Sequence, residues 1–459
     1  MSYKGKIVIL GFGSIGSGLL PLLLKHFQPE KILVIGADDR NINISAKYSV
    51  AHIIEPVLPG NYQSVLARYT QPGDFLVNLS VNVSSKALVE WCQLNQVLYQ
   101  DTCIEPWEGF YTDTSLPVER RSNYALRQEM LDYRANLPNG NKGPTAIMAH
   151  GANPGLVNHF VKRALLNIAY KLGSNLNPKT RADWTTLSQT LGLKVIHIAE
   201  RDTQTPKSPK ARGEFVNTWS VDGFVSEGLQ PSELGWGTHE KSLPQDAQRF
   251  SFGCQSAIYL NRPGCVTKVR SWTPGEGAYQ GWLVTHNESI SISDYFSNSE
   301  YRPTVHYAYH PCDSAVMSMH ELAGKNYTQQ TSQRLIVDEV ESGVDELGVL
   351  LMGTFGAYWY GSHLSIQEAR KLAPHNNATS LQVVAPVLAG ILWAIEHPNE
   401  GILEADELPF QEITKVTDPY MGNLVGAYTN WTPLEDRGLL FPEEVDSSDP
   451  WQFLNFRVS

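Results

Sequence analysis

The stretch Ile7-Val-Ile-Leu-Gly-Phe-Gly-Ser-Ile-Gly16 lies near the N-terminus and decides the fold class. Its first four residues are apolar and predict a buried strand, and the three glycines that follow have the spacing of a phosphate-binding turn. In such a turn the first glycine permits the bend, the second lets the backbone approach a pyrophosphate, and the third lets the next helix pack on the strand. The helix points its N-terminus at the phosphates. The residues expected to contact a dinucleotide here are Gly11, Gly13, Ser14, Ile15 and Gly16.

An acidic residue follows at the distance expected for a ribose contact. Asp38 lies 22 residues past Gly16, about the spacing at which such folds place the acid that binds the ribose hydroxyls. A carboxylate there repels a 2′-phosphate, so we expect NAD rather than NADP as cofactor. Asp39 is the alternative for the same contact, and Arg40 keeps NADP open because an arginine can accept the phosphate.

The first 150 residues alternate short apolar runs with amphipathic runs, which is typical of βαβ units and a parallel sheet. Strands are expected at residues 6–10, 31–35, 75–78, 97–100 and 146–149, and crossover helices at 19–24 and 87–94. Ser80, Asp101 and Thr102 follow the ends of expected strands. Since the carboxyl ends of parallel strands face the ligand in such folds, these three residues are also candidate cofactor contacts.

The second half of the chain has a different character. Residues 214–310 are rich in Gly, Trp, Tyr and Thr and contain β-prone runs at 256–260, 281–285 and 305–309, whereas 203–213 resembles a loop. Residues 381–397 predict an apolar helix, and the tail from 446 is polar with few core residues. We predict an α/β protein with an N-terminal Rossmann-type doubly wound parallel sheet and a second α+β domain on a largely antiparallel sheet. The expected boundaries are 1–155, completed by a returning helix near 376–400, then 156–375, and a C-terminal segment at 401–459.

Composition excludes several classes of protein. The 36 Lys and Arg against 47 Asp and Glu give a net charge of −11, which opposes general nucleic-acid binding. The five cysteines are widely spaced without a CxxC pair, so neither a disulfide framework nor a metal site is expected. No apolar run approaches the roughly 18 residues of a membrane span. We therefore expect a cytoplasmic protein that binds neither nucleic acid nor membrane.

Carboxylates and aromatic residues interleave in both halves. A site for a compact diamine needs carboxylates at both ends of an alkyl chain and aromatic walls that favour a cation over a ring face. The alternative is that the acids lie on solvated faces and the tryptophans in the core, and spacing alone does not choose. The same holds for Asn153, which is either a polar group at a strand end or part of an Asn-Pro-Gly turn, and for lone histidines such as His286. The carboxylates and tryptophans to which these two alternatives apply are Glu105, Trp107, Glu108, Glu200, Glu214, Trp219, Glu227, Glu233 and Trp236.

Several blocks together resemble the bacterial homospermidine synthases, members of the saccharopine-dehydrogenase-like proteins. The glycine turn is common to many families. More specific are Asn217-Thr-Trp-Ser220 and Glu233-Leu-Gly-Trp-Gly-Thr-His-Glu240, and the segments 101–108 and 150–157 match as well. The likeness runs over nearly the whole chain in order.

The resemblance implies a homodimeric transferase that uses NAD as an internally recycled redox group. One putrescine gives a hydride to NAD and becomes an imine, a second putrescine displaces ammonia, and the hydride returns to give homospermidine. Spermidine can also donate the aminobutyl group in this family. Residues 156–375 would then bind substrate and form the dimer.

The resemblance also implies roles for single residues. Trp219 faces the cation, Glu200 and Glu227 hold ammonium ends, and Glu108 lies on the access path, with Glu105 as its close alternative. Asn153 lies near nicotinamide and substrate, and His286 is a candidate proton carrier. Whether His286, a carboxylate or water accepts the proton of the substrate amine stays open.

Two other functions compete with this interpretation. A saccharopine- or carboxyspermidine-type NAD(P)-dependent dehydrogenase would bind substrate carboxylates through arginines, and Arg201 and Arg212 keep that alternative open. A non-catalytic NAD-binding regulatory module would keep the glycine turn but would not need the Trp and Glu blocks of the second half.

Overall fold

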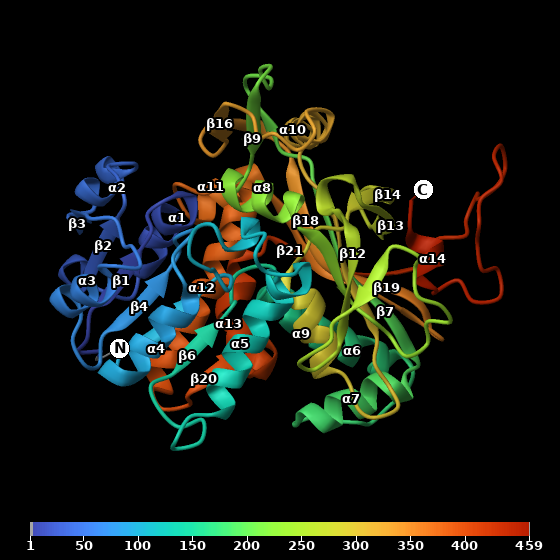
Figure 1. Cartoon of the computed structure of the whole chain (residues 1–459), viewed down its shortest axis with the longest axis horizontal. Coiled ribbons are helices and arrows are strands. Elements are labelled where there is room, and N and C mark those ends of the chain that lie inside the picture. The colour runs from blue at the N-terminus through green and yellow to red at the C-terminus, as the bar shows by residue number, and fades with distance from the viewer. Residues whose placement is uncertain (1–2, 459) are drawn as a thin grey trace.

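Two β-sheets form the framework of the computed structural model, which describes residues 3–458 (Figure 1). The first is a parallel sheet in the order β20-β6-β5-β4-β1-β2-β3. The strand order reverses beside β1, as in dinucleotide-binding folds. The predicted fold class is confirmed for this half. Its strands are β1 (Ile7–Leu10), β2 (Ile32–Gly36), β3 (Ala51–Ile54), β4 (Phe75–Asn78), β5 (Leu98–Asp101), β6 (Ala146–Met148) and β20 (Ile402–Glu404).

Five of these seven strands were predicted from the sequence, each within one or two residues of its observed ends. Sequence reasoning missed β3, a four-residue edge strand whose apolar residues are interrupted by His52 and are exposed or half-buried. It also missed β20, because this strand comes from the C-terminal segment and pairs with β6 more than 250 residues away in the chain.

Helices cover both faces of the parallel sheet (Figure 1). The first begins directly at the glycine turn, earlier than the expected 19–24, and tolerates Pro21 inside it. The apolar helix predicted at 381–397 is α12 (Ala378–Glu396), and it returns to pack against α1 and α13. It is apolar and long enough to span a membrane, so the expectation that no run approaches that length is wrong. Most of the helix is buried in this protein, so its apolarity reflects the core. The helices around this sheet are α1 (Ser14–Leu23), α2 (Ile42–Lys47), α3 (Tyr62–Tyr69), α4 (Ser85–Asn95), α5 (Asn123–Ala135), α12 and α13 (Phe410–Thr417).

The second sheet has ten strands and is largely antiparallel, as predicted. Its main path is β11-β12-β10-β15-β7-β18-β19-β21, and β13 and β14 branch from β15. Among the pairs of this sheet within residues 3–458, only β7 and β15 run parallel. The strands are β7 (Leu193–Asp202), β10 (Pro231–Gly235), β11 (Ala247–Arg249), β12 (Ala257–Pro263), β13 (Lys268–Thr273), β14 (Gly277–Trp282), β15 (Thr304–His310), β18 (Val344–Gly353), β19 (Gly356–Ser365) and β21 (Asn423–Thr429).

One local prediction in this half is wrong, and another is right for most of its residues. The run 281–285 is not one strand, because β14 ends at Trp282 and the chain then leads into α9 (Asn287–Tyr295). The stretch 203–213 is mostly loop but contains β8 (Thr205–Pro206), which pairs with β17 (Val340–Ser342). A second small sheet joins β9 (Glu214–Asn217) to β16 (Ser332–Leu335). The other helices are α6 (Leu156–Lys171), α7 (Arg181–Thr190), α8 (Val221–Leu229), α10 (Asp313–Gly324), α11 (Ile366–Leu372) and α14 (Phe453–Phe456).

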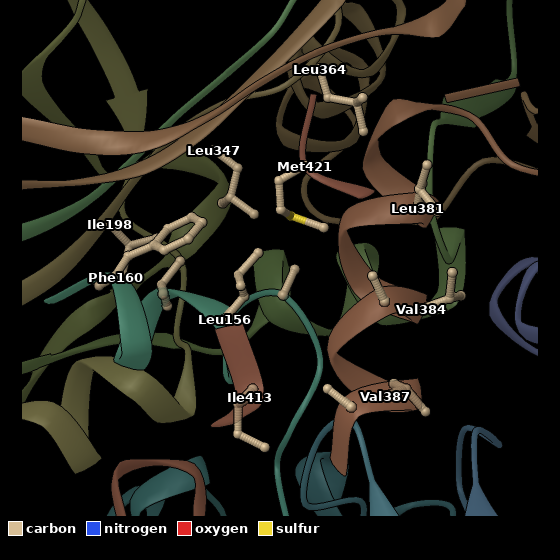
Figure 2. Packing of buried hydrophobic residues seen from close by; sticks show 14 of the residues in the cluster. Leu156, Phe160, Ile198, Leu347, Leu364, Leu381, Val384, Val387, Ile413 and Met421 are labelled. Carbon is tan, nitrogen blue, oxygen red and sulfur yellow. The ribbon is translucent and has the colours of Figure 1, made fainter. Parts of the chain in front are cut away.

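One apolar core connects the two sheets. Side chains from α6, such as Leu156 and Phe160, meet Ile198 of β7 and Leu347 of β18 on one side (Figure 2). Residues of α12, including Val384, close the same cluster from the other side. The parallel sheet and the mixed sheet therefore share a buried boundary, and α6 leads from the end of β6 into it.

The polar C-terminal tail contributes more to the core than expected. Trp451, Phe453 and Phe456 are buried against the mixed sheet, with exposed fractions of 6%, 0% and 0%. The prediction of few core residues in this tail is wrong, because its overall polarity hides three apolar anchors within six positions.

Candidate active site

The three glycines of the first turn have three different surroundings. Gly11 has a φ of +91°, and a Cβ atom there would lie 2.7 Å from the Leu79 carbonyl carbon. A Cβ on Gly16 would lie 2.5 Å from the Gly11 carbonyl oxygen, so the fold itself requires these two glycines. A Cβ on Gly13 would meet no heavy atom within 4 Å. The open space beside Gly13, at the N-terminus of α1, fits a pyrophosphate.

The acidic residues after β2 lie near this turn. Asp38 is half-buried and its carboxylate accepts a hydrogen bond from the Arg40 guanidinium at 2.8 Å, whereas Asp39 is exposed. The hydrogen bond to Arg40 lowers the pKa of Asp38, so the group is a carboxylate at neutral pH. Asn41 supports the turn, since its Nδ2 donates to the Phe12 carbonyl oxygen at 3.0 Å.

Replacing Asp38 by alanine should change the cofactor preference. We expect Asp38→Ala to weaken NAD binding about tenfold, because a charged hydrogen bond to the ribose is lost. We expect NADP binding to strengthen, because Arg40 loses its carboxylate partner and becomes free for a 2′-phosphate. Titration of both cofactors checks this, with Asp39→Ala as the matched control. An unchanged preference in Asp38→Ala would move the ribose contact to Asp39.

The other predicted cofactor contacts lie at the carboxyl ends of β4 and β5. Ser80 follows β4, and its backbone N–H donates to Asn78 Oδ1 at 3.2 Å. Asp101 is buried and accepts hydrogen bonds from the Ala149 backbone N–H at 2.6 Å and the Tyr99 hydroxyl at 2.8 Å. Its carboxyl group therefore holds the ends of β5 and β6 together, and burial raises its pKa to about 6. The contacts of Ser80, Asp101 and Thr102 with a cofactor stay predictions.

Asn153, Glu200 and Tyr307 form a hydrogen-bonded group in which Glu200 and Tyr307 are buried and Asn153 is half-buried. Asn153 lies between β6 and α6, and its Nδ2 donates to Glu200 Oε2 at 3.0 Å and to the Tyr307 hydroxyl at 2.7 Å. The Tyr307 hydroxyl in turn donates to the same carboxylate oxygen. The parallel pairing of β7 with β15 places the two strands side by side here. Burial raises the pKa of Glu200 to about 8, although both hydrogen bonds act in the opposite direction.

Glu227, His286 and Glu288 form a second group next to the first. His286 Nε2 lies 3.0 Å from Glu227 Oε2, and its Nδ1 lies 3.2 Å from Glu288 Oε1. Burial alone would lower the pKa of His286, but the two carboxylates outweigh it and raise that pKa well above its usual value. The imidazole ring lies 4.4 Å from the Tyr307 ring, centroid to centroid, which joins the two groups. Glu200 and His286 therefore share one site.

Trp219 lies in the turn between β9 and α8. It is partly exposed, and its indole Nε1 donates to the Tyr309 hydroxyl at 3.1 Å. Tyr309 is stacked on Tyr307, with centroids 5.2 Å apart and planes 3° from parallel. The indole therefore belongs to the same site as Glu200, and the structure brings together all five of the predicted catalytic residues: Asn153, Glu200, Trp219, Glu227 and His286.

An acidic cavity of about 550 Å³ has Glu105, Trp107, Glu108 and Phe110 among its lining residues. Glu108 is exposed, whereas Glu105 accepts a hydrogen bond from the Asn82 backbone N–H at 3.3 Å. Burial raises the pKa of Glu105 to about 7, and the nearby charge of Glu227 adds to the effect. Both glutamates therefore border the cavity. Of the two, Glu105 is the one that interacts electrostatically with Glu227.

Other acids and tryptophans from the sequence have ordinary structural roles. Glu214 forms an ion pair with Arg334 at 2.8 Å. Glu233 accepts hydrogen bonds from the first backbone N–H groups of α5, and Trp236 is buried in the core. Arg201 was the reason to consider a dehydrogenase that binds substrate carboxylates, but its guanidinium is paired with Glu276 at 3.1 Å.

Sequence reasoning missed three residues of the site: Tyr307, Tyr309 and Glu288. A signal was present for the tyrosines, because Thr304-Val-His-Tyr-Ala-Tyr-His310 places them two positions apart in a strand. A period of two puts both rings on one face of a sheet. Glu288 lies two residues after His286 in Thr-His-Asn-Glu, but nothing in that spacing distinguishes it from a solvated acid.

Two family models match successive parts of the chain. Residues 7–147 match the saccharopine dehydrogenase NADP binding domain, and residues 151–429 match the saccharopine dehydrogenase C-terminal domain. A homospermidine synthase from Blastochloris viridis is 51% identical over 99% of this chain and 97% of its own length. The chain belongs to the homospermidine synthase family.

Two further relatives agree. A homospermidine synthase from Mesorhizobium japonicum is 47% identical over 99% of this chain and 96% of its own length. The crystal structure of a homospermidine synthase from Legionella pneumophila, in complex with NAD, has a TM-score of 0.93 at 49% identity and covers 100% of this chain and 98% of that one.

Proposed function

We propose that this protein is an NAD-dependent homospermidine synthase that transfers an aminobutyl group from putrescine to a second putrescine. The products are homospermidine and ammonia, and spermidine is the alternative donor. The observation that supports this most strongly is the hydrogen-bonded group of Asn153, Glu200 and Tyr307. Tyr309 links it to the partly exposed indole of Trp219. A carboxylate and an aromatic face side by side suit an alkyl diamine.

The cofactor would bind along the carboxyl edge of the parallel sheet. The open space at Gly13 and the N-terminus of α1 suit the pyrophosphate, and Asp38 suits the ribose. NAD, when bound, supplies a group that takes up a hydride and gives it back, so the transfer is redox-neutral. Asn153 follows β6 at this edge and joins it to Glu200.

The protein's own residues would hold cations and move protons. Glu200 and Glu227 hold ammonium ends, and the face of Trp219 stabilises positive charge that develops at the reacting carbon–nitrogen bond. Glu227 and Glu288 keep His286 protonated, which suits it to donate a proton to departing ammonia. Burial leaves Glu200 largely protonated at neutral pH. A bound ammonium group favours the carboxylate, so Glu200 first loses its proton and can then accept one from the substrate amine.

Diamine binding should therefore release a proton. At pH 7 a group with a pKa of about 8 is mostly protonated, and a bound ammonium lowers that pKa. We expect release of about one proton at pH 7, falling toward zero as the pH rises past the free pKa, and diamine affinity that increases from pH 6 to 8. Calorimetry of the NAD-free enzyme, which cannot turn the diamine over, in buffers of different ionisation enthalpy measures the release. Glu200→Gln keeps the shape and should release fewer protons; equal release would exclude Glu200.

The function itself is tested by supplying putrescine and NAD. We expect homospermidine and ammonia in equal amounts without accumulation of NADH. Putrescine deuterated at the carbons bearing nitrogen should pass its label into homospermidine, and added unlabelled NADH should not dilute that label. Accumulating NADH would indicate a conventional dehydrogenase, and binding of NAD without any product would indicate a regulatory module.

We further propose that the enzyme is a homodimer and acts in the cytoplasm. Leu439, Leu440 and Phe441 are 74%, 88% and 77% exposed on a C-terminal segment that projects from the body (Figure 1, red). Arg437 fixes the base of this segment by donating to the Asn455 carbonyl oxygen at 2.6 Å. Consecutive exposed apolar residues on a fixed support suit a contact with a second copy. This contact lies outside residues 156–375, which the resemblance implied as the dimer-forming part, so we place it in the C-terminal segment instead. All five cysteines are free, as expected in a reducing compartment.

The dimer proposal predicts a change of mass. We expect the double variant Leu440→Glu, Phe441→Glu to be monomeric at concentrations where the natural sequence is dimeric, because charge at these positions opposes burial. Light scattering after gel filtration measures the mass. A matched control places glutamate at Leu94, which is 81% exposed on α4. An unchanged mass in the double variant would remove this segment from the dimer contact.

A further inference from the structure

We propose that Tyr309 is a positioning residue that fixes the Trp219 indole for a cationic substrate; the inference rests on the function proposed above. Trp219 lies in a turn, one residue before Ser220, which caps α8 by accepting a hydrogen bond from the Gly223 backbone N–H at 3.1 Å. The only hydrogen bond of its side chain within the described residues is the one from Nε1 to the Tyr309 hydroxyl, 3.1 Å away. This bond ties a side chain on a turn to a strand in the centre of the mixed sheet.

Tyr309 is a rigid support for this bond. Its side chain is fully buried, and it lies opposite Glu200 in the parallel pairing of β15 with β7. One face of its ring is stacked on Tyr307, and the Phe224 ring approaches it edge-on at 5.6 Å. Phe224 also lies 5.3 Å from the Trp219 ring. The indole is therefore held at two places, by Phe224 against its ring and by Tyr309 at its nitrogen.

The orientation of the indole matters because a cation is attracted to the ring face and not to the ring edge. A tryptophan without a fixed orientation would lose rotamer freedom each time it binds substrate, which weakens binding. With the nitrogen tied to Tyr309, the plane of the ring is set before the substrate arrives. A hydrogen bond at the indole nitrogen thus supports the cation site without touching the substrate.

The same strand also sets the position of the carboxylate. Tyr307 and Tyr309 are two residues apart on β15, so both rings lie on one face of the sheet. Tyr307 donates to Glu200, while Tyr309 accepts from Trp219. The spacing between the carboxylate and the indole is thus fixed by one strand. Because these two groups would hold the two parts of a diamine, Tyr309 should contribute to the choice of chain length.

The test is Tyr309→Phe in the NAD-loaded enzyme. This variant keeps the stacked ring and removes only the oxygen that accepts from the indole. We expect kcat/KM for putrescine to fall about fivefold, with unchanged NAD affinity and melting temperature, and a smaller loss for 1,5-diaminopentane. The matched control is Tyr301→Phe, since the Tyr301 hydroxyl is buried and donates to the Leu193 carbonyl oxygen at 3.0 Å but is not part of the site.

A double-mutant cycle separates positioning from a merely structural role. Trp219→Phe has no indole N–H, so adding Tyr309→Phe to it should cost nothing further in kcat/KM. Additive losses in the double variant, or a Tyr309→Phe enzyme as active as the natural sequence, would overturn the inference. If Tyr309→Phe lowers the melting temperature more than Tyr301→Phe does, the cycle is run at a temperature where both proteins are folded. Failure of the natural sequence to make homospermidine would instead refute the proposed function.

Discussion

Replacing Gly13 by valine is expected to abolish NAD binding while leaving the chain folded. The space around Gly13 is open in the protein, so a larger side chain meets no protein atom there. The same space is where the turn would bring its backbone against a pyrophosphate, and a valine would occupy it. The expected loss of affinity is more than about a hundredfold, because the phosphate contacts at the N-terminus of α1 are blocked together.

Calorimetric titration with NAD, run beside a thermal melt, measures both properties. Gly60→Val is the matched control, because a Cβ there also meets no heavy atom within 4 Å and the residue is exposed away from the turn. We expect that variant to bind NAD normally. Gly16→Val should behave in the opposite way and lower the melting temperature, because its Cβ would lie 2.5 Å from a backbone oxygen. Normal NAD affinity in Gly13→Val would place the pyrophosphate elsewhere.

The first half of the fold could be predicted because its signals are local. An apolar run, a glycine turn and a helix lie next to one another in the sequence, and each βαβ unit repeats that order. The strand β20 could not be predicted, because its three residues pair with β6 across a long chain separation. The anchors Trp451 and Phe456 were missed for a related reason, since a polar segment gives no periodic pattern to detect.

The candidate site was only partly predictable. Glu200 and Glu214 are the same residue type and spacing alone did not separate their roles, yet one is buried beside Tyr307 and the other is paired with Arg334. The difference arises from strand pairing over about a hundred residues, which spacing does not encode. The resemblance to homospermidine synthases selected Glu200, and the geometry now gives a physical reason: this carboxylate is buried and shared between two polar neighbours. Tyr309 had no such guide, although its alternation with Tyr307 was visible.

Activity should fall in the order Trp219, Trp219→Phe, Trp219→Leu. The indole has the most negative ring face of the natural side chains, phenylalanine keeps a weaker one, and leucine has none. A cation over a desolvated indole is stabilised by up to about 2 kcal/mol, so its loss in Trp219→Leu corresponds to a rate about thirtyfold lower. Trp219→Phe should lie between, because it keeps a ring but also loses the hydrogen bond to Tyr309.

A core role for Trp219 would give a different pattern, which the melting temperature distinguishes. Trp219 is partly exposed, so its replacement removes less buried surface than that of a core tryptophan. Trp236, which is 4% exposed and packs edge-on against Phe453, is the matched control: Trp236→Leu should lower the melting temperature strongly while the remaining folded enzyme keeps its kcat. For Trp219→Leu we expect the reverse, a low kcat at a nearly unchanged melting temperature and NAD affinity. A fully active and equally stable Trp219→Leu enzyme would exclude both roles, because neither the cation nor the core would then depend on the indole.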